Sequence, residues 1–424
     1  MTESTRATDR GALAAVFLVV LVDLLGFGLV LPLLAHYGMK YGASAAGVGV
    51  LYGSYSMAQL VFAPVWGAIS DRVGRRPVML VSTAGAVLAY LLFAVADSYA
   101  ALLVSRILAG VMGGNISTAQ AYVADVTSER DRAKGMGLIG AAFGIGFVLG
   151  PALAALLTHP AMAQAAGRWA GDAAVLWFAD HGRSLPGWTA AGLSALSFCL
   201  VALRLPESKP AGAPAGSGIS RSFVLSGGFW KPLLTGGPLS LLLACSLVLA
   251  IGHSTLYSAF PIYCQRVVGL EAHRVGLQFA WMGLISVLIQ GGLIRRLVQR
   301  YRESSLFIVG SIVFAVALLV LPLARTEGAL SATLALLAIG ASLNGPTLTS
   351  LISKRSDPAS YGRILGSAQG FSALGRVIGP VWGGVLAGWS PIAPFAPTAL
   401  LVGGLVVLGV AASRGIDSPS RHPA

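Results

Sequence analysis

Long apolar runs recur along the whole chain and are separated by short polar stretches that carry most of the charge. Each run is close to the ~20 residues that a helix needs to cross a bilayer core of ~30 Å. Because lipid offers no hydrogen-bond partners, a crossing backbone must satisfy its polar groups within each segment, so we expect helices. We predict twelve of them, over residues 12–35, 47–69, 78–96, 100–123, 136–157, 188–203, 238–261, 274–294, 305–323, 329–351, 363–389 and 393–412.

Composition and charge support this interpretation. The chain is 55% hydrophobic and only 11% charged, whereas about a quarter of the residues are charged in a soluble domain. Its net charge of +13 is unevenly placed: 21 of the 29 Lys and Arg residues fall in the two tails and in the five loops on the same side, and 6 fall on the other side. This asymmetry follows the positive-inside rule. We therefore expect a multi-pass protein of the cell (inner) membrane with both termini cytoplasmic, and we attribute the excess positive charge to topology, with no nucleic acid as partner.

The two halves of the chain repeat each other at an offset of 228–229 residues. Four features share this offset: Pro32 with Pro261, Asp71-Arg72 with Gln299-Arg300, Asn115 with Asn344, and Gly146-x-x-x-Gly150-Pro151 with Gly375-x-x-x-Gly379-Pro380. Such a repeat is typical of transporters with two related bundles and a site between them. We predict an all-α membrane protein with six-helix bundles over 1–203 and 236–424, joined by a Pro/Gly-rich cytoplasmic linker over 204–235.

The external connection over 158–187 is unusually long and contains several Trp and His residues. One interpretation is an amphipathic segment with tryptophans at headgroup level. The other is an external gate or a surface for a partner.

A compact basic motif lies between the second and third apolar runs, formed by Gly67, Asp71, Arg72, Gly74, Arg75 and Arg76. The plain interpretation is a basic loop that only sets topology. The full spacing and the apolar flanks, however, resemble the signature loop of the major facilitator superfamily. The resemblance implies that Asp71 caps the helix over 363–389 and locks the outward-facing state, with Asp125 pairing with the loop arginines. The second-half loop has Gln299 in place of that acid, so we expect a stronger lock in the first half.

Two charged residues lie inside predicted membrane helices of the first half. A charged Asp23 inside the membrane raises the free energy by at least a few kcal/mol unless the carboxyl group is protonated, paired or facing water. A carboxyl group whose surroundings alternate can take up and release a proton, which a proton carrier requires; a permanently paired structural acid is the alternative. Arg106 cannot deprotonate in practice and needs an acid or a polar substrate. Its Arg-x-x-x-Gly110 spacing resembles the superfamily's helix-four motif, which implies proton coupling. We expect Asp23 and Arg106 to be partners.

The fifth apolar run carries a face of small residues that ends in Gly146, Gly150 and Pro151. Glycines allow two helices to approach closely, and this alone explains the glycines. The Gly-x-x-x-Gly-Pro pattern also resembles the helix-five motif of proton-driven exporters, although the usual following glycine pair is Ala154-Ala155 here.

Further polar or aromatic residues within the helices are candidates for a substrate cavity. Each could equally form an interhelical hydrogen bond. They are Tyr55, Gln59, Asn115, Gln120, His253, Tyr257, Gln290, Asn344, Gln369 and Arg376.

The whole chain resembles the twelve-helix drug:proton antiporters, and within them the tetracycline-exporter branch. The resemblance implies a mostly monomeric secondary transporter that exports small amphipathic compounds in exchange for protons, with the proton gradient as its energy source and no cofactor. Three departures are Ala89 and Phe314, where those exporters carry acids, and Ser286, where they carry a His. Because these groups would favour metal-bound tetracycline, an apolar or weakly cationic compound fits better.

Two other classes of function are alternatives to this interpretation. A sugar or metabolite transporter of the same superfamily, working as a symporter or a facilitator, is the alternative. The helices contain no nucleophile elbow, phosphate loop, metal-ligand cluster or carboxylate pair, so we expect neither an enzyme nor a metal site.

Overall fold

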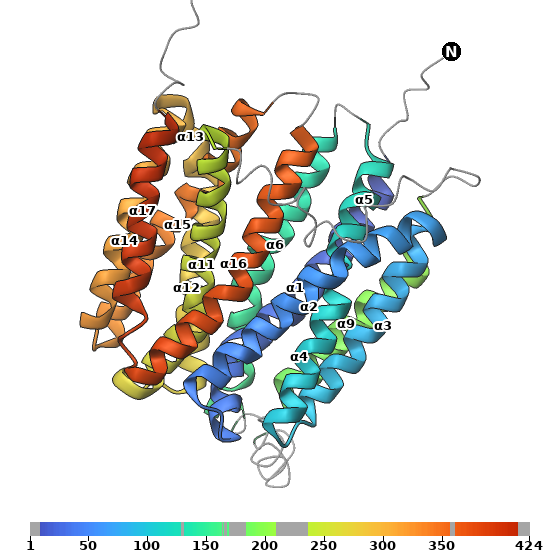
Figure 1. Cartoon of the computed structure of the whole chain (residues 1–424). Helices are drawn as coiled ribbons and strands as arrows, with labels where there is room; N and C mark the ends of the chain where they lie inside the picture. Colours follow the sequence, from blue (N-terminus) through green and yellow to red (C-terminus); the bar gives the residue numbers. More distant parts are fainter. Residues whose placement is uncertain are drawn as a thin grey trace, which may run out of the picture. The chain divides into compact units, whose positions relative to one another are not determined.

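The computed structural model describes residues 9–128, 131–162, 164, 168, 184–208, 236–356 and 361–413 (Figure 1). Within these residues all regular structure is helical, which confirms the predicted all-α class. The chain divides into two compact units, 1–221 with 269–283 and 222–268 with 284–424. We call them unit 1 and unit 2. Of the predicted linker, residues 209–235 lie outside the described part of the chain, as does most of the 158–187 connection.

Unit 1 contains the first half of the repeat. Its helices are α1 (Arg10–Lys40), α2 (Ala45–Val73), α3 (Arg75–Ala94), α4 (Tyr99–Gly113), α5 (Ile116–Val126), α6 (Arg132–Leu157) and α9 (Leu185–Arg204). The run predicted over 100–123 is two helices, because α4 ends at Gly113 and α5 begins at Ile116, yet together they form one span.

The second half of the repeat begins at α11 (Pro238–Tyr263) and runs to the end of α17. The elements are η1 (Cys264–Val268), α12 (Ala272–Leu288), η2 (Ile289–Leu293), α13 (Ile294–Arg300), α14 (Glu303–Val320), η3 (Leu321–Leu323), α15 (Glu327–Arg355), α16 (Tyr361–Trp389) and α17 (Phe395–Ser413). The first part of α12 groups with unit 1, where Gly276 packs against Pro151 and Ala155 of α6.

Polar residues at the ends of the apolar runs begin the helices. Asp9 Oδ1 accepts a hydrogen bond from the Ala12 amide at 3.0 Å, and Ser44 Oγ accepts one from Gly47 at 3.1 Å. These oxygens satisfy amides that have no partner inside their helices. The helix boundaries therefore fall where the sequence changes from polar to apolar.

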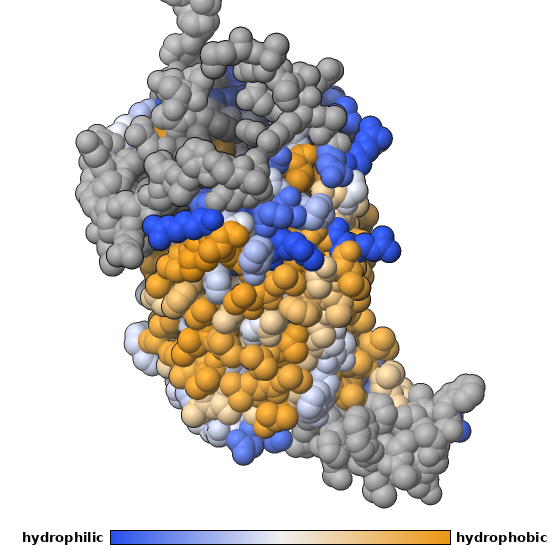
Figure 2. Space-filling view, turned by 90° about the vertical axis from the view of Figure 1, so that its right-hand side faces the viewer, coloured by the Kyte–Doolittle hydropathy of each residue, from blue (hydrophilic) through white to orange (hydrophobic). Residues whose placement is uncertain are grey.

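Eleven helical segments of the described residues are long and apolar enough to cross a membrane, and α16 is a further helix of 29 residues. Many of their exposed positions are apolar: on α3, Val81 and Leu88 lie seven residues apart, and Leu196 and Leu203 repeat this spacing on α9. Figure 2 shows one face of the molecule, on which hydrophobic residues form a broad band bordered by hydrophilic ones. Such a surface is suited to lipid, and the chain is a multi-pass membrane protein.

The packing of each unit centres on one helix pair. In unit 1 α1 packs along α6, and in unit 2 α11 packs along α16. The core beside α1 is aliphatic and aromatic, with Val16, Val19 and Tyr122 almost fully buried. Functional side chains on α1 are therefore held on a helix that is packed on several sides.

Candidate functional site

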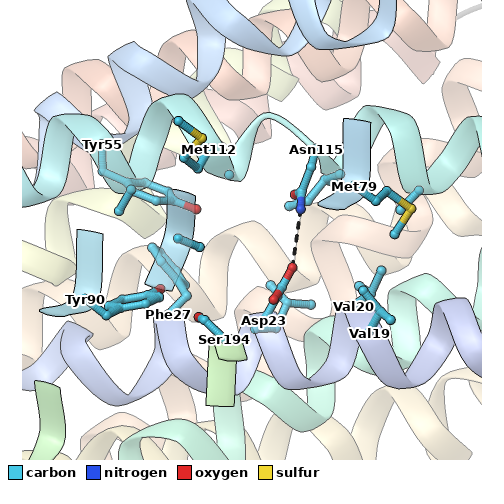
Figure 3. Close-up of a pocket in the computed structure, with 16 residues that line it drawn as sticks. Val19, Val20, Asp23, Phe27, Tyr55, Met79, Tyr90, Met112, Asn115 and Ser194 are labelled. Atoms are coloured by element: carbon cyan, nitrogen blue, oxygen red, sulfur yellow. Dashed lines mark hydrogen bonds between the residues drawn. The ribbon is translucent and has the colours of Figure 1, made fainter. Parts of the chain in front are cut away.

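A cavity of about 40 Å³ lies inside unit 1, between α1, α2, α3, α4, α5 and α9 (Figure 3). Most of its lining is apolar, including Val20, Phe27, Met79 and Met112. Asp23 supplies the one carboxylate among the lining residues. A charged group in such surroundings requires polar partners or water.

The two oxygens of Asp23 differ in their surroundings. Oδ2 accepts a hydrogen bond at 3.3 Å from Nδ2 of Asn115, the residue directly before α5, drawn as the dashed line in Figure 3. Oδ1 is buried and has no hydrogen-bond partner among the described residues. Asn115, expected only as a cavity residue, thus contacts the predicted proton carrier directly.

Arg106 does not form the expected pair with Asp23. In the described part of the chain its guanidinium lies over the rings of Tyr90 at 5.6 Å and Phe93 at 5.0 Å, and Nε and Nη2 have no hydrogen-bond partner. The physical reason is the position of Tyr90, which lines the cavity with Asp23 and also faces Arg106. Cation–π contacts therefore take the place of the predicted ion pair.

Two more predicted cavity residues lie on α2. Tyr55 lines the cavity, with its ring centroid 4.7 Å from that of Phe27. Gln59 Nε2 donates to the Gly113 carbonyl at 3.0 Å, where α4 ends. Gln59 therefore forms the interhelical hydrogen bond that was the alternative to a substrate contact.

The glycines of the helix-five motif bring α6 against α1 next to Asp23. A Cβ atom on Gly146 would lie 2.6 Å from Leu24 Cβ, and one on Gly150 would lie 2.6 Å from the Gly28 backbone. Pro151 is also in contact range of Gly28. The motif sets the distance between α1 and α6. It thereby also sets the position of Asp23, which directly precedes Leu24.

The basic motif forms an ion-pair cluster where α2, α3 and α5 meet. Arg75 pairs with Asp71 four residues earlier, and its Nε lies 3.1 Å from Asp125 Oδ2. The Arg75 side chain is only 12% exposed, so these pairs are better shielded than ordinary surface pairs. We call Asp71, Arg75 and Asp125 the loop cluster.

Glu207 is a member of this region that the sequence analysis missed. Its carboxylate accepts hydrogen bonds from the backbone amides of Arg75 at 2.9 Å and Arg76 at 3.0 Å, at the N-terminus of α3. Gly74 has φ +107°, and a Cβ there would meet the Glu207 carboxylate. The sequence feature that could have identified Glu207 is its place as an acid just after the sixth apolar run, within the predicted linker.

The remaining motif residues surround this cluster. Arg76 Nη2 donates to the Ala202 carbonyl at 2.6 Å, which ties α3 to α9. A Cβ on Gly67 would lie 3.9 Å from Ser117 Oγ of α5, and Arg72 is exposed at the end of α2. The contact with the helix over 363–389 that the resemblance implies for Asp71 stays a prediction.

In unit 2 the polar residues are arranged differently. Asn344 is fully buried; its Oδ1 accepts a hydrogen bond from Ser311 at 3.3 Å, and its Nδ2 has no partner among the described residues. The His253 ring lies 4.8 Å from the ring of Phe314, which is itself buried. His253 therefore has an apolar contact on this side.

The other predicted cavity residues divide by exposure. Tyr257 on α11 and Arg376 on α16 are half-buried within unit 2. Three glutamines are exposed, namely Gln120 on α5, Gln290 in η2 and Gln369 on α16. None of these five lines the cavity around Asp23.

Comparisons with known proteins agree with this architecture. The profile of the Major Facilitator Superfamily matches residues 16–380 and 293–422. The Bos taurus major facilitator superfamily domain-containing protein 10 is 31% identical, over 89% of this chain and 87% of its own length. The class D tetracycline resistance protein of Salmonella ordonez is 30% identical, over 86% of both chains.

Solved structures give the same result. The crystal structure of the human organic anion transporter MFSD10 (TETRAN) covers 94% of this chain and 99% of its own, with 25% identity and a TM-score of 0.65. A bacterial homologue of the human lysosomal transporter Spinster has a TM-score of 0.70 at 14% identity, which supports the fold alone. This chain belongs to the Major Facilitator Superfamily, and it is a transporter with the fold of that family, not an enzyme.

Proposed function

We propose that this superfamily member is a proton-coupled secondary transporter that exports small amphipathic compounds in exchange for protons, in the manner of the tetracycline-exporter-like drug:proton antiporters. The proton gradient supplies the energy and no cofactor is needed. The protein works as a monomer in the cell inner membrane, with both termini cytoplasmic. The observation that carries the proposal is Asp23, a carboxylate on α1 whose Oδ1 faces the interior of unit 1 without a partner.

The surroundings of Asp23 suit a group that changes its protonation. One oxygen is held by Asn115, and the other borders a cavity with room for about three water molecules. No described cation pairs with it permanently, since Arg106 lies against Tyr90 and Phe93. A carboxyl group in this position can hold a proton in one conformation and release it in another.

The cargo is proposed from the lining and from the relatives. The cavity is too small for a drug-sized molecule in this conformation, so the substrate needs the alternating movement of the halves that the superfamily uses. The printed names of relatives point to different cargo, tetracycline for one and organic anions for another. Ala89 and Phe314 are fully buried apolar residues where tetracycline exporters carry acids, which argues against metal-bound tetracycline here.

The loop cluster is proposed as the conformational lock. Arg75 joins Asp71 of α2 to Asp125 of α5, and Glu207 fixes the start of α3. Together they hold three helix ends in one arrangement, which a change of state must release.

The test is the Asp23→Asn variant in proteoliposomes with an imposed pH gradient, after a growth-inhibition panel in a pump-depleted host has identified a transported compound. We expect gradient-driven export to fall at least tenfold, while substrate counterflow at equal pH persists. Asp97→Asn is the matched control, because Asp97 is an exposed acid in the α3–α4 turn. Normal gradient-driven export in the Asp23 variant would refute the mechanism.

A symporter or facilitator of sugars or other metabolites is the second candidate. The favouring observation is Arg106, whose buried Nε and Nη2 have no described acceptor, as expected for a group that meets an anionic or polar substrate. Substrate uptake that runs with the proton gradient in the same proteoliposomes would select this candidate over export.

A further inference from the structure

Two buried oxygen atoms border the same cavity in unit 1 without a hydrogen-bond partner. Asp23 Oδ1 and Ser194 Oγ both have none among the described residues, and both residues line the cavity. Ser194, on α9, is 1% exposed, and Figure 3 shows its side chain beside that of Asp23. Ser194 was not among the sequence candidates.

Buried polar atoms in proteins are almost always paired, either with protein groups or with ordered water. An apolar cavity stays dry, but a cavity lined by several polar groups holds water when it offers more than 10–15 Å³ per molecule. This cavity has about 40 Å³ and is bordered by a carboxylate, an amide and hydroxyl groups. It meets both requirements for about three water molecules.

We infer that the cavity holds a small cluster of water that hydrates the Asp23 carboxyl group and links it to the Ser194 hydroxyl. Asp23 is then a hydrated proton-binding site within unit 1, with Asn115 and Ser194 as positioning residues. The inference rests on the proposed role of Asp23 in proton coupling and deepens it. The proton is taken up and released through water, with no direct transfer from another ionisable side chain.

The groups around Asp23 support this assignment. The ionisable side chains that line the cavity with it are Tyr55 from α2 and Tyr90 from α3, both of which are weak acids. From α4, Arg106 is directed at Tyr90 and Phe93. Asn115 directly precedes α5, and α9 contributes the hydroxyl groups of Ser194 and of Ser197, which also interacts with the Asp23 carboxyl group. Helix α6 has no ionisable residue over 136–157. Water is thus the available acceptor for the Asp23 proton.

Infrared difference spectroscopy on the purified full-length protein tests the inference without a substrate. The carboxyl C=O band that disappears in Asp23→Asn identifies the group. We expect this band to shift within seconds of transfer to D₂O, and its pH midpoint to rise by about one unit in Ser194→Ala, since lost hydrogen bonds weaken the ionised form. Ser246→Ala is the matched control: Ser246 is a buried serine on α11 of unit 2, away from Asp23, and its Oγ donates to the Leu242 carbonyl of its own helix at 3.2 Å.

A second variant removes the space without touching a polar group. Ala86 lines the cavity, and Ala86→Val adds two methyl groups there. We expect hydrogen exchange at Asp23 to slow at least tenfold. If the band exchanges slowly in the wild type, or if Ser194→Ala and Ala86→Val both behave like Ser246→Ala, the hydrated site is refuted. If these shifts occur but export in Asp23→Asn is still driven by the gradient, the inference stands and the proposed function fails.

Discussion

The central helix pairs of the two units are built from the same repeat but are stabilised in different ways. In unit 1, α1 meets α6 through Gly146 and Gly150 and carries Asp23 beside a cavity. In unit 2, α11 meets α16 through equivalent glycines, and hydroxyl groups seal the contact. Ser254 donates to the Gly375 carbonyl at 3.0 Å, Thr255 to Gly379 at 3.2 Å and Ser258 to Pro380 at 2.8 Å. The α1–α6 contact lies beside a carboxylate, whereas the α11–α16 contact is made by glycines and neutral hydrogen bonds.

The repeat offset shows where this difference arises. Asp23 maps to Gly252, while Asn115 maps to Asn344. The asparagine is therefore present in both units, but only unit 1 has an acid for it to contact. In unit 2 the Asn344 amide meets Ser311 instead. The same position of the repeat therefore has different partners in the two units.

The ion pairs at the helix ends differ in a related way. The offset maps Arg75 to Glu303 and Asp125 to Lys354, and Glu303 Oε2 lies 2.7 Å from Lys354 Nζ. The charges are reversed, but the pair is kept. Arg75 and Glu303, which occupy equivalent positions, are each 12% exposed, whereas Lys354 is 60% and Asp125 is 28% exposed. The first-half pair is therefore better shielded at the Asp125 end only, and the stronger lock expected in the first half stays a prediction.

Placing an acid in unit 2 is the most severe test of this comparison. A Cβ on Gly252 would lie 2.6 Å from Val402 and 3.3 Å from Phe314, so Gly252→Asp puts a charge into a filled apolar space. We expect a loss of more than ~3 kcal/mol and almost no folded protein. Size-exclusion chromatography of the detergent extract measures this, with Gly252→Ala as the milder control. A normal elution peak for Gly252→Asp would show that unit 2 can also accommodate a carboxylate.

The glycine contact in unit 1 gives the next largest effect. In Gly150→Ala the new methyl group would meet the Gly28 backbone, which cannot rotate away, so we expect a loss of ~1–3 kcal/mol. Thermal unfolding in detergent should show a melting temperature several degrees lower. Gly140→Ala is the control, since a Cβ there meets nothing within 4 Å. Equal melting temperatures would mean that α1 and α6 are not in close contact.

Asp125→Asn and Lys354→Met compare the two ion pairs. Removing the Asp125 charge leaves the shielded Arg75 with a weaker partner, and we expect a loss of about 1 kcal/mol and a several-fold change in transport rate. Lys354→Met removes an exposed charge, and the shielded Glu303 keeps its hydrogen bond from Ser350 Oγ at 2.9 Å, so stability should change by less than ~0.5 kcal/mol. Denaturation and transport assays on both variants check the order, and a reversed order would contradict the shielding argument.

The smallest effect is expected from single hydroxyl groups in unit 2. Ser258→Ala removes one hydrogen bond between α11 and α16, and such bonds in membranes contribute ~0.6 kcal/mol on average. Ser246→Ala is matched to it, because Ser246 donates to Leu242 of its own helix. A melting temperature that is lower for Ser258→Ala than for Ser246→Ala supports the interhelical role. Identical values would show that the glycine contacts alone hold the pair.

Much of the architecture follows from the chain alone. The apolar runs, the repeat offset and the basic motif after Gly67 predict membrane helices, two related halves and the superfamily, because each depends on local composition or on fixed spacing. Asp23 was identifiable for the same reason, as an acid in an apolar run is expensive wherever the run is packed. The repeat offset likewise predicts the positions of prolines and glycines in one half from those in the other, as with Gly150-Pro151 and Gly379-Pro380.

Tertiary structure decided which of these residues meet. Asp23 contacts Asn115 and not Arg106, since Tyr90 from a third helix lies against the guanidinium. Ser194 and Glu207 had no distinguishing pattern around them, and they gained their places only when α9 packed against α1 and α3. Periodicity states which face of a helix is apolar, but the partner of a polar side chain depends on how several helices converge, and that is set by packing among residues far apart in the sequence.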